Sequence, residues 1–303
     1  MKKSDEEALR RAVKGVEGEV SRNEPLRLHT TLRIGGPADV LVIPKDLPSL
    51  ARLVRQAREQ KASIFVLGGS NLLVRDGGIR GIVLKLSHFQ KITDIDETQI
   101  EAEAGVQLSR LARHACERGL SGFEFALGIP GTMGGAVVMN AGTREGEMAD
   151  VLTGVRVMES NGEIRSVGRE EMTFGYRWSR LPPGVIVSAR VKLQPAGRAE
   201  IQRRMQGFID RRKATQPLTL PNAGSVFKNP NGTFAAKLVE SAGLKGHRVG
   251  DAQVSEQHAN FIVNRGRATA KDVLKLIRLI GKRVEERTGI ALELELRIVG
   301  RDF

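Results

Sequence analysis

The sequence is poor in cysteine and in aromatic residues, and both shortages exclude classes of protein. Cys116 is the only cysteine among 303 residues, so the chain can form neither an internal disulfide nor a cysteine-rich zinc or iron–sulfur site. The histidines show no ligand-like spacing, and we expect no metal site. Aromatic residues are 4% of the chain, too few for the stacking platforms that bind single-stranded nucleic acid.

The chain also lacks a segment that would take it into or across a membrane. No run approaches the roughly 18 apolar residues of a membrane-spanning helix. The first residues mix acidic and basic side chains and contain no apolar stretch typical of a secretory signal. We therefore expect a cytoplasmic protein with no membrane insertion, in keeping with its single cysteine.

Basic residues and glycine, by contrast, are in excess. Lysine and arginine number 48 against 35 acidic residues, which gives a formal net charge of +13. Such a charge suits nucleic acid, a membrane surface or phosphorylated small molecules, and charge alone does not choose among them. Glycine accounts for 34 residues, above the average of roughly 7%. Because backbone without a Cβ can approach an anion closely, this excess indicates an anionic partner.

Apolar patterning predicts alternating strands and helices in the first third of the chain. Residues 1–25 form a polar helical lead-in in this interpretation. Asp46 and Pro48 begin a helix by N-cap and first-turn preferences, and its apolar stripe includes Leu50 and Leu53. We expect the neighbouring strands at 40–43, 64–67 and 82–86.

The remaining two thirds of the chain divide at a proline-rich break near residues 200–220. Before the break we expect three antiparallel strands and a basic amphipathic helix, at 151–158, 163–166, 185–193 and 198–213. After it, the pattern predicts a long helix capped by Thr269 and ended by Gly289. A last strand is expected at 292–299.

Two glycine-rich segments, at 66–78 and 127–142, lie beside apolar runs, as a cradle for a phosphate group requires. Neither carries the G-x-G-x-x-G or Walker A pattern, which excludes the usual dinucleotide fold and the P-loop NTPases. Tight turns and close packing are the alternative use of these glycines. Two such loops in a basic chain favour anion binding, and a third glycine pair, at 35–36, follows Arg33.

Several polar residues have sequence neighbours that suggest a binding or catalytic site. Tyr176 and Arg177 lie beside the only tryptophan, although an ordinary exposed strand fits equally well. Ser225 follows a small, flexible pair of residues, where a turn is the alternative. Glu293 and Glu295 would share one face of the last strand, where a solvated surface is the alternative.

Six segments, taken together and in order, resemble the family of UDP-N-acetylenolpyruvoylglucosamine reductases. They lie at 31–39, 69–74, 122–136, 176–179, 223–230 and 292–297. The short span from 179 to 185 lacks an insertion that one subclass carries, so the chain resembles the shorter subclass. Its first glycine loop is one residue shorter than the usual family pattern, which leaves the pyrophosphate contacts of that loop open.

The resemblance implies an α+β fold with noncovalently bound FAD. Two lobes of the vanillyl-alcohol-oxidase type, at 1–88 and 89–204, would bind the flavin, and a C-terminal α+β domain at 205–303 would bind the substrate. The implied cofactor contacts are Arg33, Gly35, Gly68, Gly69, Ser70, Asn71, Gly131, Thr132, Gly134, Gly135 and Ala136.

The resemblance also implies a reaction. NADPH reduces the flavin, and the enolpyruvyl group of UDP-N-acetylglucosamine enolpyruvate is then reduced to give UDP-N-acetylmuramate for peptidoglycan precursor synthesis. C3 of that group receives a hydride and Ser225 protonates C2. Arg177 stabilises the developing negative charge, and Glu295 matches the terminal catalytic glutamate. The implied substrate contacts are Tyr176, Lys228 and Asn229.

Two other functions remain open on the residues alone. A different FAD-dependent oxidoreductase of the same fold, acting on an alcohol, would need neither Ser225 nor Glu295. A basic nucleic-acid-binding protein would explain the charge but gives the ordered motifs no role. The sequence does not indicate an oligomeric state.

Overall fold

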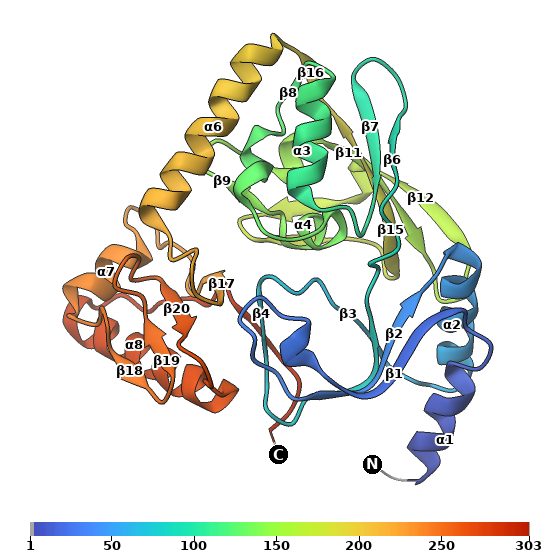
Figure 1. Cartoon of the computed structure of the whole chain (residues 1–303), viewed down its shortest axis with the longest axis horizontal. Helices are drawn as coiled ribbons and strands as arrows, with labels where there is room; N and C mark the ends of the chain where they lie inside the picture. The colour runs from blue at the N-terminus through green and yellow to red at the C-terminus, as the bar shows by residue number, and fades with distance from the viewer. Residues whose placement is uncertain (1–2, 303) are drawn as a thin grey trace. The chain divides into compact units, whose positions relative to one another are not determined.

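A computed structural model describes residues 3–302 (Figure 1). These residues form two compact units. The first contains the described residues up to Arg22, with Val40–Gly68 and Gly81–Arg211, and the second contains Asn23–Asp39, Gly69–Arg80 and the chain from Arg212 onward. Two short N-terminal segments therefore belong to the same unit as the C-terminal third. The division at residues 88 and 204 stays a prediction.

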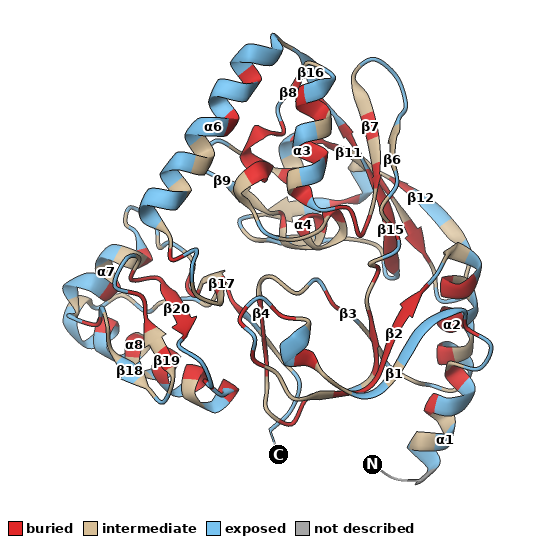
Figure 2. Cartoon of the chain, in the orientation of Figure 1, coloured by how far each residue is buried: buried red, intermediate tan, exposed pale blue. Residues whose placement is uncertain are grey.

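Each unit has its own apolar core (Figure 2). The second core explains the membership of the two short segments, because Leu32, Ile34 and Leu73 are buried together with residues of the C-terminal third, among them Phe227 and Ile277. Burial of large aliphatic side chains is the main favourable term in folding, so these few residues tie their segments to that unit.

The N-terminal part contains the four-stranded sheet β1-β2-β5-β3. Its elements are α1 (Lys3–Ala12), β1 (Gly18–Pro25), β2 (Pro37–Pro44), α2 (Leu47–Glu59), β3 (Ile64–Val66) and β5 (Ile79–Leu84). The three expected strands are confirmed. So is the helix, because the Asp46 side chain accepts the Ser49 N–H and Leu50 and Leu53 are buried.

The lead-in over residues 1–25 was expected to be helical, and this is wrong for its second half. The helix α1 ends at Ala12, and Gly18–Pro25 forms the edge strand β1 beside β2. Most of β1 is exposed and polar, so it carries no apolar alternation for a sequence pattern to detect. Its pairing with β2 decides its conformation, as tertiary context does for many weak strands.

The rest of the first unit is built on the five-stranded sheet β12-β11-β15-β7-β6, whose neighbouring strands are all antiparallel. Its strands are β6 (Ile92–Asp94), β7 (Gln99–Glu103), β11 (Leu152–Met158), β12 (Ile164–Gly168) and β15 (Val185–Lys192). The expected antiparallel group is confirmed.

Short helices and hairpins accompany this sheet. They are α3 (Leu108–Glu117), β8 (Leu120–Ser121), α4 (Met133–Met139), β9 (Gly142–Thr143), β10 (Gly146–Glu147), α5 (Met148–Val151), β13 (Thr173–Gly175), β14 (Trp178–Arg180) and β16 (Gln194–Pro195), with 3-10 turns at Glu124–Gly128 and Arg169–Glu171. A further 3-10 turn, Leu26–Leu28, lies in the second unit. The expected basic helix is α6 (Arg198–Thr215).

The second unit holds the sheet β17-β20-β19-β18 and the two-stranded parallel pair β4–β21. Its elements are β4 (Leu72–Val74), β17 (Asn222–Ser225), α7 (Ala235–Ser241), β18 (Arg248–Val249), β19 (Ala252–Val254), β20 (Phe261–Asn264), α8 (Ala270–Thr288) and β21 (Arg297–Val299). The long helix is confirmed, with a capping box between Thr269 and Asp272 and Gly289 at its C-cap.

The last strand is shorter than expected. We predicted it at 292–299, but β21 covers only Arg297–Val299. The residues before β21 bond to a different segment than β21 does. The Arg297 N–H donates to the Asn71 carbonyl at 3.2 Å, whereas the Glu295 N–H donates to the Val226 carbonyl at 2.9 Å. Because one stretch of chain pairs with two different segments, it cannot continue as one regular strand.

Candidate functional site

The two glycine-rich segments meet within the first unit. A Cβ built on Gly68 would lie 3.8 Å from the Cα of Gly135, and a Cβ on Gly135 would lie 3.8 Å from the Cα of Gly68. That distance is an ordinary van der Waals contact, so packing does not require either residue to be glycine. The two positions expose bare backbone to each other, which is the arrangement a phosphate cradle needs. They fit the flavin dinucleotide that the motifs indicate.

Other glycines of the second segment are held by the protein itself. A Cβ on Gly134 would lie 3.0 Å from that of Ala104, and the Gly134 N–H donates to the Ala104 carbonyl at 2.9 Å. The Gly131 carbonyl accepts the Leu108 N–H at 3.1 Å, and the Thr132 carbonyl accepts that of Ala136 at 2.9 Å. These contacts fix the start of α4 against the β7–α3 connection.

In the second unit, the segment that contains Arg33 is bonded to the end of the first glycine loop. The Thr31 N–H donates to the Gly69 carbonyl at 3.1 Å, and its hydroxyl donates to the Ser70 carbonyl at 3.2 Å. Arg33 has a φ of 55° and Gly69 a φ of 83°. Gly35 lies two residues beyond Arg33, and its carbonyl accepts the Arg27 N–H at 3.3 Å. The structure thus brings together two of the three segments predicted to contact the cofactor.

Arg177 sits in the turn of the β13–β14 hairpin, in the first unit. Gly175 pairs with Trp178, so Tyr176 and Arg177 form a two-residue turn in which Arg177 has a φ of 62°. Its guanidinium lies over the Tyr176 ring, 4.8 Å from the centroid, and Nη2 donates to the Gly142 carbonyl at 2.8 Å. The arginine is thereby held at the end of the second glycine-rich segment.

Asn140 fixes this hairpin, and sequence reasoning missed it. Its side chain is fully buried. Nδ2 donates to the Gly175 carbonyl at 3.1 Å, while Oδ1 accepts the Ala149 N–H at 3.0 Å. The Ser179 hydroxyl adds a bond to the Val138 carbonyl at 2.9 Å. The available signal was a lone amide in an uncharged, apolar stretch, because a buried polar side chain needs partners.

Ser225 and Glu295 are brought close through the backbone, in the second unit. Ser225 ends β17, and the next carbonyl, that of Val226, accepts the Glu295 N–H at 2.9 Å. The Asn71 side chain donates to the Glu295 carbonyl at 3.0 Å. Asn71, a predicted cofactor contact, thus bonds to the same short segment as one predicted catalytic residue.

Lys228 and Asn229, the predicted substrate contacts of this unit, both have partners within the protein. The Lys228 ammonium forms an ion pair with Glu293. The Asn229 Oδ1 accepts the Ala235 N–H at 3.1 Å, at the start of α7. The side chain of Glu293 is 74% exposed, whereas Glu295 is half-buried. The expected common strand face for the two glutamates is wrong, because the chain is not a continuous strand there.

A cavity of about 470 Å³ lies beside α6. In the described part of the chain, its lining of residues from 121–125, 145 and 203–211 includes none of the predicted site residues. Arg204 and Arg211 on its wall are paired with Glu200 and Glu145. Neighbouring acidic residues therefore partly neutralise the basic cluster of α6. The cavity is a surface groove, and none of the predicted site residues, all within the described chain, lines it.

Residues 3–302 contain no group of three or more histidine, cysteine, aspartate or glutamate side chains placed to hold a metal ion. None of the helices in this range is both long enough and apolar enough to cross a membrane.

Family comparisons agree with the geometry of the glycine segments. Residues 38–168 match the model of an FAD binding domain, and residues 216–299 match the C-terminal domain of UDP-N-acetylenolpyruvoylglucosamine reductase. The paired glycine segments and the FAD binding domain indicate an FAD-binding oxidoreductase. The match at residues 216–299 adds a C-terminal reductase domain. The expected α+β fold class and the FAD cofactor are confirmed.

Relatives match almost the whole chain. UDP-N-acetylenolpyruvoylglucosamine reductase 2 of Symbiobacterium thermophilum is 48% identical over 289 residues, 94% of each chain. The enzyme of Bacillus licheniformis is 47% identical over 287 residues, 93% of this chain and 95% of the relative. The crystal structure of the reductase from Thermus caldophilus has a TM-score of 0.80 and 44% identity, covering 94% of this chain and 99% of that one.

This chain belongs to the UDP-N-acetylenolpyruvoylglucosamine reductase family. The resemblance seen in six ordered motifs is confirmed, and with it the FAD-dependent enzyme class. Family membership leaves the alcohol-oxidising and nucleic-acid-binding hypotheses without support.

Proposed function

We propose that this protein uses NADPH to reduce the enolpyruvyl group of UDP-N-acetylglucosamine enolpyruvate, giving UDP-N-acetylmuramate for peptidoglycan precursor synthesis in the cytoplasm. Family membership over 94% of the chain supports the reaction. The observation that carries the site is the pair of backbone bonds by which Val226 and Lys228 hold the segment of Glu295 beside Ser225.

The chemistry divides into a hydride part and a proton part. Bound FAD would supply the hydride chemistry, the transfer of a hydride equivalent from NADPH to C3 of the enolpyruvyl group. The proton for C2 comes from the protein in this proposal, from the Ser225 hydroxyl. Substrate, NADPH and one proton then give product and NADP⁺. A serine hydroxyl is a weak acid near neutral pH, so a neighbour must return the proton to it.

Glu295 is the group that we assign beside Ser225. Its backbone N–H bonds to the residue that follows Ser225, at 2.9 Å. The residue is half-buried, which suits a hydrogen-bonding or proton-holding role of its carboxyl. Arg177 supplies the positive charge that an enolate-like carboxylate requires. Its guanidinium is pre-oriented by the Tyr176 ring and the Gly142 carbonyl, and a fixed cation need not reorganise during the reaction.

Tyr176, Lys228 and Asn229 are assigned to substrate binding. Lys228 supports this role because its partner, Glu293, is largely exposed. The Glu293 carboxylate is largely solvated and is held weakly in place, so the ammonium can exchange that carboxylate for a phosphate. In the same proposal, residues 205–303 bind the substrate, while 1–88 and 89–204 bind the flavin.

Ser225→Ala tests the proton-donor role. We expect reduction of the flavin by NADPH to stay nearly unchanged, while reoxidation of the reduced enzyme by the substrate slows strongly, because only the second step consumes the proton. Stopped-flow absorbance separates the two steps. Ser241→Ala, at an exposed serine of α7 in the same unit, is the matched control and should leave both steps unchanged. Equal loss in both steps would remove Ser225 from this role.

A further inference from the structure

Asn260 is a buried amide whose two polar ends bond to the backbone of a single residue. Its side chain lies just before β20 and the residue is only 3% exposed. Oδ1 accepts the Phe227 N–H at 3.0 Å, and Nδ2 donates to the Phe227 carbonyl at 2.8 Å. Two antiparallel strand residues that face each other exchange this same pair of bonds. The amide of Asn260 therefore acts as one more strand residue.

The sheet needs such a substitute at this point. Between Asn222 and Ser225 the pairing of β17 with β20 shifts in register, and Ser225 pairs with Phe261, the first residue of β20. The Val226 N–H still reaches the Asn260 carbonyl, at 2.9 Å. From there the side chain of Asn260 takes the place that the next strand residue would hold, and it extends the ladder to Phe227.

The other edge of the same segment bonds to the chain around Glu295. The Val226 carbonyl accepts the N–H groups of Glu295 and Leu296, at 2.9 and 3.2 Å, and the Lys228 N–H donates to the Glu293 carbonyl at 2.8 Å. The Val226 carbonyl and the Lys228 N–H thus bond to the Glu295 segment, whereas the Val226 N–H and both backbone groups of Phe227 bond to Asn260. The stretch after Ser225 is thus held from both sides.

We propose that Asn260 is a positioning residue for the proton step: it fixes the backbone of residues 225–227 so that Ser225 keeps its place relative to Glu295. This rests on the roles proposed above for Ser225 and Glu295. The side chain of Asn260 acts only through the Phe227 backbone. Its loss would leave a buried N–H and a buried carbonyl without partners, so the segment would move to satisfy them. The proton donor would then lie away from its productive geometry, and small displacements of this kind cost rate.

Three variants of the full-length, flavin-loaded enzyme test the proposal. Asn260→Ala removes both bonds to Phe227. Asn260→Asp keeps the shape and the acceptor but loses the donor, and protonation of the introduced carboxyl at low pH restores a donor. Asn264→Ala is the matched control, because Asn264, the last residue of β20, is another buried asparagine, 4% exposed, that bonds to the Leu32 carbonyl and to the N–H groups of Gly266 and Ala268.

We expect Asn260→Ala to slow reoxidation of the reduced flavin by the substrate roughly tenfold or more, with flavin reduction by NADPH changed by less than about twofold. The loss should fall on kcat rather than KM. In Asn260→Asp, the rate relative to the unsubstituted enzyme should recover as pH falls. Hydrogen exchange at the amide of Phe227 should be faster in both variants, and Asn264→Ala should keep the ratio of the two rates despite its lower Tm.

A purely structural role predicts a different result. Asn260→Ala would then lower Tm as Asn264→Ala does and would change the two half-reactions equally or not at all, which would overturn the proposal. If Asn260→Ala fails to fold, Asn260→Asp without recovery at low pH overturns it equally. Failure of the underlying roles is distinguishable: if Ser225→Ala itself leaves reoxidation unchanged, the proton-donor assignment is wrong, whatever Asn260 does.

Discussion

Replacing Gly68 by alanine separates a packing role from a ligand-binding role of the first glycine loop. The added Cβ would meet only the Cα of Gly135, at 3.8 Å, and Gly68 does not have a φ in the left-handed region. Alanine at such a position stabilises a protein by about 0.4–1 kcal/mol, because it narrows the unfolded ensemble. We therefore expect Gly68→Ala to leave the flavin-free protein as stable as before or slightly more stable.

Flavin binding should respond in the opposite direction. If a phosphate of the cofactor approaches the bare backbone here, one methyl group keeps it at a distance, and we expect FAD affinity to fall at least tenfold, about 1.4 kcal/mol. At a flavin concentration 100 times the original Kd, bound flavin adds about 2.7 kcal/mol of stability. A tenfold weaker site at that concentration would retain only about 1.4 kcal/mol.

The assay is denaturant unfolding with and without FAD, together with a fluorescence titration of the flavin. Gly207→Ala in α6 is the matched control, because its Cβ would meet nothing within 4 Å. It should raise stability by up to about 1 kcal/mol through helix propensity and leave FAD affinity unchanged. A Gly68→Ala protein that loses stability without FAD and keeps its flavin affinity would refute the cradle.

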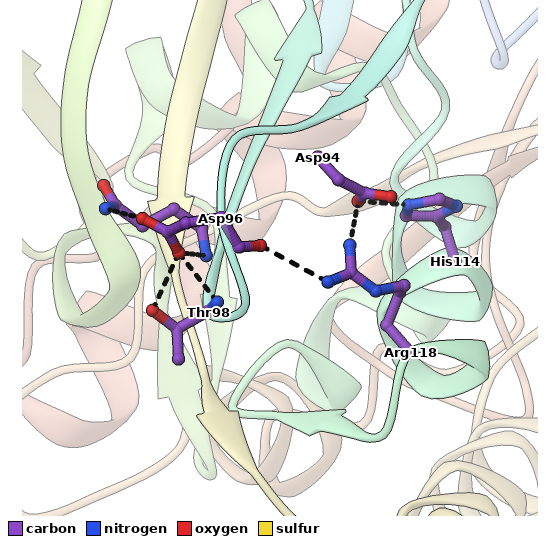
Figure 3. Close-up of polar contacts among 6 residues, drawn as sticks. Asp94, Asp96, Thr98, His114 and Arg118 are labelled. Atoms are coloured by element: carbon purple, nitrogen blue, oxygen red, sulfur yellow. Dashed lines mark hydrogen bonds and ion pairs between the residues drawn. The ribbon is translucent and has the colours of Figure 1, made fainter.

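Two further predictions concern charge. Arg177→Lys should lower turnover, since an ammonium replaces neither the planar fork on a carboxylate nor the stacking on Tyr176; steady-state kinetics at saturating substrate measure this, and unchanged turnover would exclude Arg177 from the site. Acid should destabilise the fold in part through Asp94, which lies between His114 and Arg118 at 2.8 and 2.5 Å (Figure 3). Burial raises the pKa of Asp94, but the hydrogen bonds and charges of these two partners outweigh it and lower the pKa overall. A lowered folded-state pKa gives stability that is present above the unfolded value and is lost as pH falls through the folded one. Unfolding curves from pH 6 to pH 3, run under identical conditions for the unsubstituted protein and for Asp94→Asn, should show a smaller acid loss in the variant; equal losses would contradict the assignment.

Much of the local structure could be predicted because its causes lie within a few residues. The Asp46 cap, the capping box of Thr269 and the end of α8 at Gly289 all depend on hydrogen bonds or φ values inside one or two turns of chain. The apolar stripe of α2 likewise follows from helical spacing alone. Such features need no knowledge of the rest of the fold.

The sequence indicates candidate site residues but not the contacts that hold them. The motifs indicated Arg177, Ser225 and Glu295 as candidate site residues. The order of the motifs along the chain indicated the family. Nothing in the local pattern indicated that Asn140 would fix the Arg177 hairpin or that Asn260 would extend a strand ladder. Nδ2 of Asn140 bonds to backbone 35 residues away in the chain, and the Asn260 amide to backbone 33 residues away. A single sequence does not indicate such distant partners.

The sequence by itself thus determined the helices with their caps, the glycine segments, the net charge and the family. Only the tertiary structure decided that residues 18–25 form an edge strand, that the last strand breaks before Arg297, and that two short N-terminal segments share a core with the C-terminal third. Local hydrogen bonds and side-chain periodicity depend only on neighbouring residues. Strand pairing and core membership depend on which distant segments compete for the same backbone groups and the same apolar surface.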